Sequence, residues 1–236
     1  VQMHALVTGG TKGIGFAIAE AMVAGGGKVA FTGRDASRVR EAAAALTKAA
    51  GDGGEVLGLV ADVRDRAAVE SAIDAAVARF GRLDTLINNA GVGKFVSVED
   101  MTDADWHQVI DTNLTGVFYA TRAAIPHLKR AGGGWIINIA SLAGRNYFAK
   151  AGAYCASKAG LVALTEAVML EVRNDNIRVS CVMPGSVSTE FSHPTAHADE
   201  SWKLTAGDIA EVVMDLMRHP ARSLPSKVEI RPSRTQ

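Results

Sequence analysis

The chain has little of several features that define whole classes of protein. Among its 236 residues there are only two cysteines, Cys155 and Cys181, which form neither a CxxC pair nor a disulfide framework. No run approaches the ~18 uninterrupted apolar residues that a membrane span requires. The first residues, VQMHALVTGG, lack the basic segment and long apolar run of a secretory signal. We therefore expect a cytoplasmic protein in a reducing compartment, without a membrane partner.

Excess charge of either sign is also absent. The 25 Lys and Arg residues balance 25 Asp and Glu residues, so the formal net charge is zero. This composition offers no electrostatic footprint for a nucleic acid or an anionic membrane surface. There is no internal repeat and no Pro/Ser-rich linker, so we expect a single domain over residues 1–236. Residues 188–204 show no clear periodicity and are expected to form a flap over a cleft.

What the sequence does contain is an alternation of strand and helix patterns. Between short apolar runs, apolar residues recur at helical spacing, for example over residues 39–50 and 69–80. Seven runs rich in Val and Ile are interpreted as buried strands: MHALVT, KVAFT, EVLGLVA, DTLIN, GWIINIA, IRVSCVM and KVEI. Buried strands separated by helices imply a parallel sheet. The predicted fold is α/β, a single-domain Rossmann-like doubly wound sheet of about seven strands with helices on both faces.

A glycine-rich loop follows the first predicted strand. The stretch ALVTGGTKGIG leads directly into the helical pattern GFAIAEAMV, with Gly9, Gly13 and Gly15 in the spacing G-x3-G-x-G. Such a loop allows a tight turn and a close approach of the backbone to a pyrophosphate at a helix N-terminus. A simple tight turn is the alternative for the loop taken alone. Its place as the first βα turn favours dinucleotide binding.

The stretch AYCASKAG, residues 153–160, places Tyr154 and Lys158 four residues apart among small side chains. Residues at this spacing share one face of a helix, so both side chains can point into one cleft. A free tyrosine has a pKa of about 10, and a nearby ammonium is expected to lower it toward the working pH. The pattern predicts an acid/base pair, against the alternative of an Ala-rich turn in a buried helix.

These patterns occur with further motifs in a fixed order. NNAG at 88–91, Asn113, Ser141 and PGSVST at 184–189 accompany the glycine loop and the YCASK motif. Over about residues 5–218 the chain resembles the short-chain dehydrogenase/reductase family, and six motifs in register make the resemblance specific. It implies an oxidoreductase that interconverts a carbonyl and a secondary alcohol.

The resemblance also implies catalytic roles. Tyr154 would be the proton donor in reduction and acceptor in oxidation, and Lys158 would also bind the nicotinamide ribose. Ser141 would hold the substrate oxygen, and Asn113 would hold a water in a relay behind the lysine. Taken singly, Ser141 reads as a strand-end or cap serine and Asn113 as a locally bonded helix residue. Together, the four favour catalysis.

Cofactor contacts follow from the same resemblance. Asp62 would lie beside the adenine, with an N-cap for the next helix as an equal alternative. Asn88 would pass under the ribose or brace strands, and Val187 and Thr189 would bind the carboxamide. The full predicted set is Gly9, Thr11, Lys12, Gly13, Ile14, Gly15, Arg34, Asp62, Val63, Asn89, Ala90, Gly91, Lys158, Pro184, Gly185, Val187 and Thr189.

The charged residues that follow the second predicted strand indicate which nicotinamide dinucleotide is preferred. NAD-preferring proteins place a carboxylate there for the ribose hydroxyl, whereas this chain has Gly33 followed by Arg34. A guanidinium can bind a 2′-phosphate in bidentate fashion, and Lys12 adds a second positive charge. Asp35 could bind the ribose instead, but it opens a helical pattern and is more simply an N-cap. We therefore predict that NADP(H) is preferred over NAD(H).

Two other functions compete with this interpretation. Enoyl reductases resemble the chain but separate the tyrosine and lysine by more residues, which argues against reduction of a C=C bond. A dinucleotide-binding redox sensor without turnover typically lacks an intact set of four catalytic residues, and all four are present. No metal is predicted: His193 and His197 have a zinc-like spacing, but Pro194 interrupts the stretch and no further ligand completes the set.

The expected partners are a small-molecule carbonyl or alcohol and a second copy of the chain. The fold does not choose the substrate, and Trp202 is a weak candidate for lining its pocket. The helical stretch YCASKAGLVALTEAVML carries more apolar surface than one sheet face needs, which predicts a homo-oligomer. The ending KVEIRPSRTQ departs from the Asp-Gly-Gly turn of many relatives, so both homodimer and homotetramer stay open.

Overall fold

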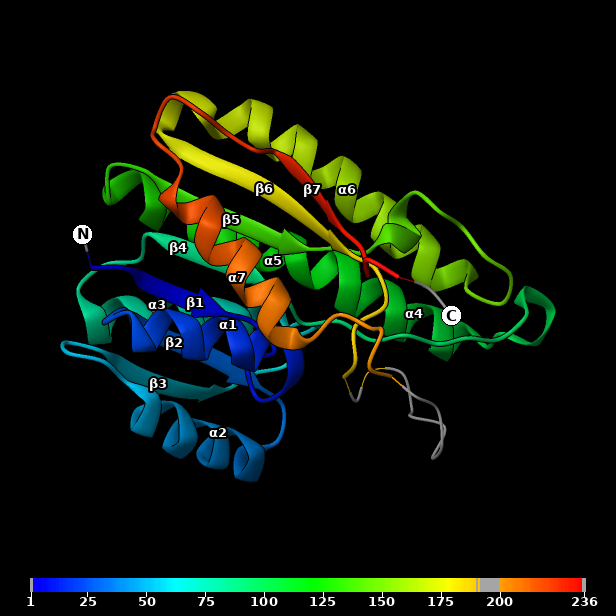
Figure 1. The fold of residues 1–236 in the computed structure, drawn as a ribbon, viewed down its shortest axis with the longest axis horizontal. Coiled ribbons are helices and arrows are strands. Elements are labelled where there is room, and N and C mark those ends of the chain that lie inside the picture. Colours follow the sequence, from blue (N-terminus) through cyan, green and yellow to red (C-terminus); the bar gives the residue numbers. More distant parts are fainter. Residues whose placement is uncertain (1, 190, 192–199, 235–236) are drawn as a thin grey trace.

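The computed structural model describes residues 2–189, 191 and 200–234. Within these residues seven parallel strands form one sheet in the order β3-β2-β1-β4-β5-β6-β7 (Figure 1). The strands are β1 (His4–Val7), β2 (Lys28–Gly33), β3 (Glu55–Val60), β4 (Thr85–Asn88), β5 (Gly134–Ile139), β6 (Ile177–Pro184) and β7 (Lys227–Ile230). All seven coincide with the predicted apolar runs, so the predicted doubly wound sheet is confirmed.

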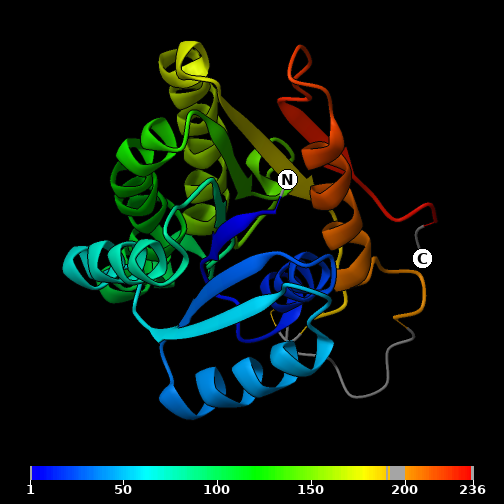
Figure 2. The same ribbon diagram turned by 90° about the vertical axis from the view of Figure 1, so that its left-hand side faces the viewer.

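Helices cover both faces of this sheet. They are α1 (Gly13–Ala24), α2 (Ala36–Ala49), α3 (Arg66–Phe80), α4 (Asp103–Ile110), α5 (Gly116–Arg130), α6 (Gly152–Val172) and α7 (Ala206–Arg218). Helices α1, α2 and α7 lie on one face and α3, α5 and α6 on the other (Figure 2). One hydrophobic cluster joins the first group to the sheet, and a second joins the other group to the opposite face. No helix in the described part of the chain has the length and hydropathy that a membrane span requires.

The two edge strands are less buried than predicted. Every residue of β3 is partly buried or exposed, and β7 alternates exposed Lys227 and Glu229 with partly buried Val228 and Ile230. The prediction of buried strands is therefore wrong for these two, because an edge strand has a neighbour on one side only. The alternation in β7 is that of a half-buried strand.

Aspartate caps set the starts of two helices. The Asp35 carboxylate accepts hydrogen bonds from two backbone N–H groups of α2, at 2.8 and 3.0 Å, which confirms its prediction as an N-cap. Asp65 caps α3 in the same way, at 2.9 and 3.2 Å. The N-cap alternative for Asp62 is thus wrong, because the chain makes one more turn before α3 begins.

The predicted flap at 188–204 includes residues 190 and 192–199, which lie outside the described residues, as do His193 and His197. The described ends of this segment lie side by side after β6. The backbone N–H of Ser188 donates to the carbonyl of Leu204 at 2.8 Å, so the chain leaves and rejoins the fold at one point.

The strand order opens a crevice at the carboxyl ends of the central strands. β1 pairs with β2 on one side and with β4 on the other. The connections after β1 and β4 therefore run in opposite directions, which opens a crevice at the carboxyl ends of the strands.

Candidate active site

A cavity of about 920 Å³ opens at the carboxyl ends of the strands of the sheet. Ligand pockets commonly measure roughly 300–1,000 Å³, so this one can hold a molecule of cofactor size together with a small substrate. Most of the predicted site residues meet in it. Besides the residues discussed one by one below, Thr11, Lys12, Ile14, Val63, Ala90, Gly91, Pro184, Gly185, Val187 and Thr189 line it.

The glycine loop after β1 presents its backbone to this cavity. Gly9 and Gly13 have φ of +68° and +57°, a left-handed conformation that favours glycine. A Cβ on Gly9 would lie 2.9 Å from the Cα of Ala90, so no side chain fits there. Gly13 lines the cavity, and a Cβ placed on it would be in van der Waals contact with Thr189 Cγ2 at 3.7 Å. The N-terminus of α1 therefore faces the cavity, where an anion such as a pyrophosphate can bind.

Gly15 is a predicted cofactor contact that the structure places elsewhere. It is buried and does not line the cavity. A Cβ on Gly15 would lie 2.3 Å from Asn89 Nδ2 and 2.4 Å from the Gly9 carbonyl oxygen. Asn89 itself lines the cavity and donates from Nδ2 to the carbonyls of Thr8 and Gly9, at 3.1 and 3.0 Å. Gly15 therefore makes room for the side chain that holds the loop.

Asn88 braces strands and does not line the cavity. Its Nδ2 donates to Asn138 Oδ1 on β5 at 2.8 Å and to Thr121 Oγ1 on α5 at 3.2 Å. Of the two roles predicted for this residue, bracing is the one the structure shows.

Charged groups gather where β2 and β3 end. Gly33, Arg34 and Asp62 line the cavity, whereas the Asp35 carboxylate accepts the hydrogen bonds that cap α2. A hydrogen bond from Arg64 lowers the pKa of Asp62, and the positive charge of Arg34 contributes a smaller effect in the same direction. Arg34 thus places an exposed guanidinium in the cavity, at the position predicted to distinguish a ribose 2′-phosphate from a 2′-hydroxyl.

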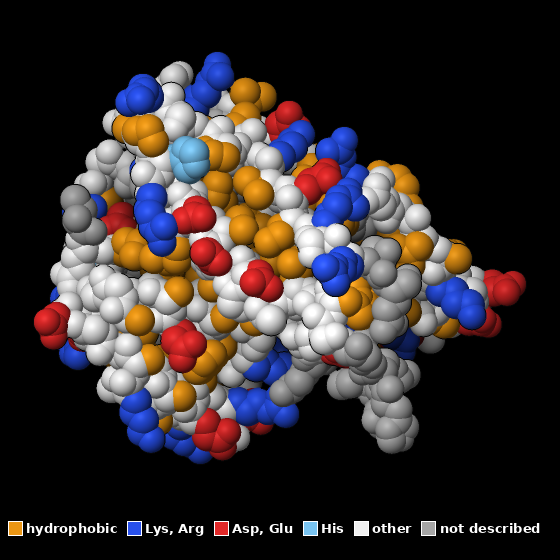
Figure 3. Space-filling model, viewed as in Figure 1, with side chains coloured by type: hydrophobic (Ala, Val, Ile, Leu, Met, Phe, Trp, Pro, Cys, Tyr) orange, Lys and Arg blue, Asp and Glu red, His pale blue; other side chains and the backbone are white. Residues whose placement is uncertain are grey.

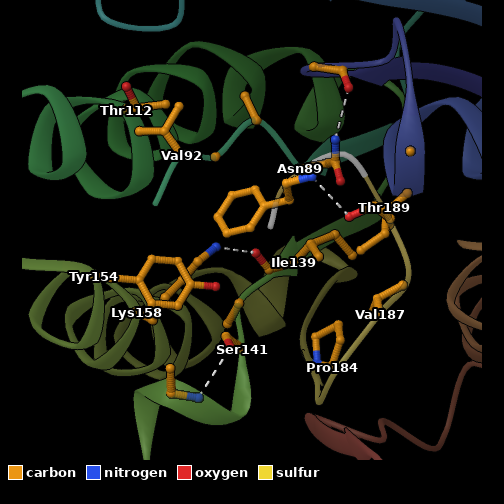
Figure 4. A pocket seen from close by; sticks show the side chains of 18 of the residues that line it. Asn89, Val92, Thr112, Ile139, Ser141, Tyr154, Lys158, Pro184, Val187 and Thr189 are labelled. Carbon is orange, nitrogen blue, oxygen red and sulfur yellow. Dashed lines mark hydrogen bonds between the residues drawn. The ribbon is translucent and has the colours of Figure 1, made fainter. Parts of the chain in front are cut away.

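Tyr154, Lys158 and Ser141 face one another in the cavity (Figure 4). The first two lie one turn apart on α6, with Lys158 Nζ 5.9 Å from the ring centroid of Tyr154. Lys158 is buried, and its Nζ donates to the carbonyl of Ile139 at 2.9 Å. Ser141 follows β5 directly, so sheet and helix together bring the three side chains to one point.

Burial dominates the acid/base properties of this pair. It raises the pKa of Tyr154, and a hydrogen bond with Ser141 offsets part of the effect. Burial lowers the pKa of Lys158 to about 8. The prediction that Lys158 brings the pKa of Tyr154 toward neutrality is therefore wrong for this structure, because desolvation of the phenolate is the largest effect on this pKa and it acts in the opposite direction. Near neutral pH the phenol is protonated.

Asn113 supports the site from behind and does not line the cavity. It lies in the π-helical turn between α4 and α5, where its Oδ1 accepts from the Val92 N–H at 2.8 Å. Its Nδ2 donates to the Val92 carbonyl at 2.9 Å and to Ser157 Oγ at 3.0 Å. Asn113 thus ties the loop after β4 to α6, the helix that carries Tyr154.

Asn113 and Lys158 nevertheless border the same space. A Cβ on Gly91 would lie 3.5 Å from Asn113 Oδ1 and 3.7 Å from Lys158 Nζ. This placement agrees with a position behind the lysine, where the family resemblance puts a relay.

An aromatic cluster in the cavity was not among the predicted site residues. Phe95, Phe148 and Phe191 line the cavity around Tyr154, and Trp202, the weak candidate, lines it too. The ring centroids of Phe95 and Phe191 lie 5.6 and 5.8 Å from that of Tyr154. The position of the three phenylalanines in the sequence could have indicated them. Each follows the carboxyl end of a different neighbouring strand, where parallel sheets bind ligands.

Comparison with known proteins gives concordant matches. A family model described as short chain dehydrogenase matches residues 3–200. The chain is 37% identical over 204 residues to D-threitol dehydrogenase of Mycolicibacterium smegmatis, covering 86% of this chain and 75% of that protein. It is 40% identical over 197 residues to a hydroxy-methyl-oxo-hexahydro-indene-carboxyl-CoA reductase of Mycobacterium tuberculosis, covering 83% and 74%. A solved metagenomic short-chain oxidoreductase in complex with NADP superposes with a TM-score of 0.85 at 35% identity, covering 99% and 98%.

Proposed function

The chain belongs to the short-chain dehydrogenase family, and on that premise we propose that it is an NADP(H)-dependent carbonyl reductase. As a family member it is an NAD(P)-dependent oxidoreductase that acts on CH–OH and C=O groups. The observation that carries the proposal is the meeting of Tyr154, Ser141 and Lys158 in one cavity at the carboxyl edge of the sheet. The reaction interconverts a small-molecule carbonyl and a secondary alcohol.

The residues present fit a dinucleotide. The backbone of the glycine loop at Gly13 and the N-terminus of α1 would hold the pyrophosphate, and Asp62 would lie beside the adenine. Val187 and Thr189, after β6, would hold the nicotinamide end. When bound, the dinucleotide supplies or accepts the hydride.

The preference for NADP(H) rests on the end of β2. Arg34 lines the cavity, and the neighbouring Asp35 carboxylate is engaged with the N–H groups of α2. A guanidinium can pair with a 2′-phosphate, whereas the carboxylate that would select a ribose hydroxyl is occupied as a cap. The NADP complex of the similar metagenomic enzyme supports the same preference.

In the proposed mechanism Tyr154 moves the proton. Its phenol, kept protonated by burial, donates to the carbonyl oxygen while Ser141 holds that oxygen by a hydrogen bond. Lys158 binds the ribose and keeps a positive charge beside the phenol as the proton leaves. Because the pKa of Tyr154 is raised, the form present near neutral pH is the protonated phenol, which is the form that reduction requires. Oxidation requires Tyr154 to accept a proton as a phenolate, which higher pH favours.

The proposal is tested by incubating the purified protein with NADPH or NADH and a panel of ketones while following the loss of nicotinamide absorbance. We expect consumption matched by alcohol formation, faster with NADPH at equal subsaturating concentrations. Tight NADPH binding without turnover of any carbonyl would overturn the proposal and indicate a redox sensor.

A further inference from the structure

Three phenylalanines remain half-exposed around the proposed proton donor. The exposed fractions of Phe95, Phe148 and Phe191 are 48%, 53% and 41%, although all three line the cavity. Single exposed apolar residues are common on protein surfaces. A group of three around one phenol is different, because it offers a continuous apolar surface where a substrate must lie.

The rings form one connected wall. Phe95 meets Tyr154 edge-on, with centroids 5.6 Å apart and planes at 66°. Phe148 continues outward from Phe95, 6.1 Å away and inclined by 28°. Phe191 closes the other side of Tyr154 at 5.8 Å. Such spacings lie in the range of about 4.5–7 Å in which aromatic rings attract one another, so the wall can extend its stacking to a further ring.

Two of the three rings pack against the loop after β4. A Cβ on Gly93 would lie 3.0 Å from atoms of both Phe95 and Phe191, so these rings contact the bare backbone there. A side chain that is already packed loses less conformational entropy when a ligand binds, which favours binding on this side of the wall.

Nearby charged groups are already engaged. Of the lining residues on the β6–β7 side, Lys203 pairs with Glu200 at 2.6 Å and Arg231 pairs with Glu229 at 2.8 Å. An anionic substrate would have to compete with these carboxylates. A polyol would place hydroxyl groups against aromatic carbon, where losing their hydration is costly.

Resting on the proposed function, we propose that the substrate is an uncharged ketone that carries a hydrocarbon ring close to its carbonyl. The carbonyl oxygen lies at Tyr154 and Ser141, and the ring lies on the wall of Phe95 and Phe148. Hydride and proton transfer then follow as in the mechanism above, and the wall decides which carbonyl compounds reach them.

A matched pair of ketones tests this. Phenylacetone and hydroxyacetone share the same methyl ketone and differ in a phenyl ring against a hydroxyl group. We expect kcat/KM with NADPH to be at least about tenfold higher for phenylacetone, since a buried aromatic ring gains that much or more. Phe148→Ala should reduce this ratio by at least about threefold. Tyr147→Ala is the control, because Tyr147 is adjacent, 70% exposed and not among the lining residues, and it should leave the ratio unchanged.

A binding measurement separates failure of this inference from failure of the proposed function. Phenylacetone is titrated by calorimetry into protein saturated with NADP⁺, for the unmodified chain, Phe148→Ala and Tyr147→Ala. Equal or faster turnover of hydroxyacetone, or an unchanged ratio in Phe148→Ala, overturns the ring preference and leaves carbonyl reduction standing. If neither ketone is reduced, carbonyl reduction is in doubt and calorimetry decides. Phenylacetone binding weakened only by Phe148→Ala supports the ring site, and absence of binding overturns it.

Discussion

Tyr154 lies where burial and hydrogen bonding act on its pKa in opposite directions. Burial raises the pKa and the Ser141 hydrogen bond lowers it, with burial the larger effect. The phenol therefore holds its proton well above neutral pH and can release it only to an oxygen that is gaining negative charge. A carbonyl under hydride attack is such an oxygen.

Tyr154→Phe should lower kcat for carbonyl reduction by at least about a hundredfold, because only the proton-transfer group is lost. The ring that contacts Phe95 and Phe191 stays in place, so the dissociation constant of NADPH, measured by fluorescence titration, should barely change. Lys158→Ala should weaken both turnover and NADPH binding, since we propose that Lys158 serves both the phenol and the ribose. If Tyr154→Phe kept more than about a tenth of the original kcat, the tyrosine would not be the acid.

The pH dependence of reduction should report Lys158. Its pKa is lowered to about 8 by burial, so the ammonium is charged below that pH and loses its charge above it. Tyr154 titrates higher, because its pKa is raised. We expect kcat/KM to be level below about pH 8 and to fall above it, with the profile measured at saturating NADPH.

Lys158→Arg gives the control for that profile, because a guanidinium stays protonated over the whole range. Its activity will be lower if the longer group fits poorly, but the fall near pH 8 should disappear. A fall at the same pH in both proteins would assign it to another group.

At the scale of elements, the junction of β2 and α2 carries two neighbouring charges: the Asp35 carboxylate caps α2, and we propose that Arg34 binds the 2′-phosphate. Arg34→Ala should raise KM for NADPH about tenfold to a hundredfold relative to NADH, the range expected for loss of a charge-assisted contact. Asp35→Ala removes the cap of α2 and should lower the temperature of unfolding, while leaving the ratio of the two KM values unchanged. Steady-state kinetics with both nucleotides and a thermal melt check the pair. Equal kcat/KM for NADPH and NADH in the unmodified protein would contradict the assignment.

Elements that local patterns determine were predictable from the sequence. The Val- and Ile-rich runs marked every strand of the sheet, and the turn from β1 into α1 was marked by its glycines. Asp62 and Asp65 show the limit of such patterns. Both are aspartates just before α3, and only the extra turn of backbone decides that Asp65 is the cap.

The candidate site was predictable in its motifs but not in its environment. Gly15 belongs to the glycine pattern, yet spacing does not tell which glycine faces a ligand and which faces Asn89. The pKa of Tyr154 depends on desolvation, which arises only when the whole site is assembled. The wall of Phe95 and Phe148 likewise joins loops far apart in the sequence, and no local pattern connects them.

At the scale of the whole molecule, the edge of the sheet at β7 and the neighbouring helix α7 are the part of the surface to which we assign a partner. Apolar side chains gather over α7 and β7 (Figure 3). In this region Val212, Met214, Met217, Leu224, Val228 and Ile230 are partly buried and pack against the core cluster beneath. The charged side chains of exposed Lys227 and Glu229 disfavour pairing of edge strand β7 with a strand of another chain. A second copy is therefore expected to cover the face through side chains and not to extend the sheet.

We predict a homo-oligomer built on this face, in place of the α6 stretch from which the sequence predicted it, measured by light scattering as a multiple of the 24.7 kDa chain at micromolar concentration. Val212→Lys places a charge among the apolar side chains and should raise the dissociation constant of the oligomer at least about tenfold. Glu211→Lys adds the same group at the neighbouring exposed position of α7 and should have the smaller effect. A monomer at micromolar concentration would contradict the oligomer. If the two variants raise the dissociation constant equally, the interface does not lie on this face. A lysine buried in the interface should weaken the oligomer more than a lysine at an exposed position.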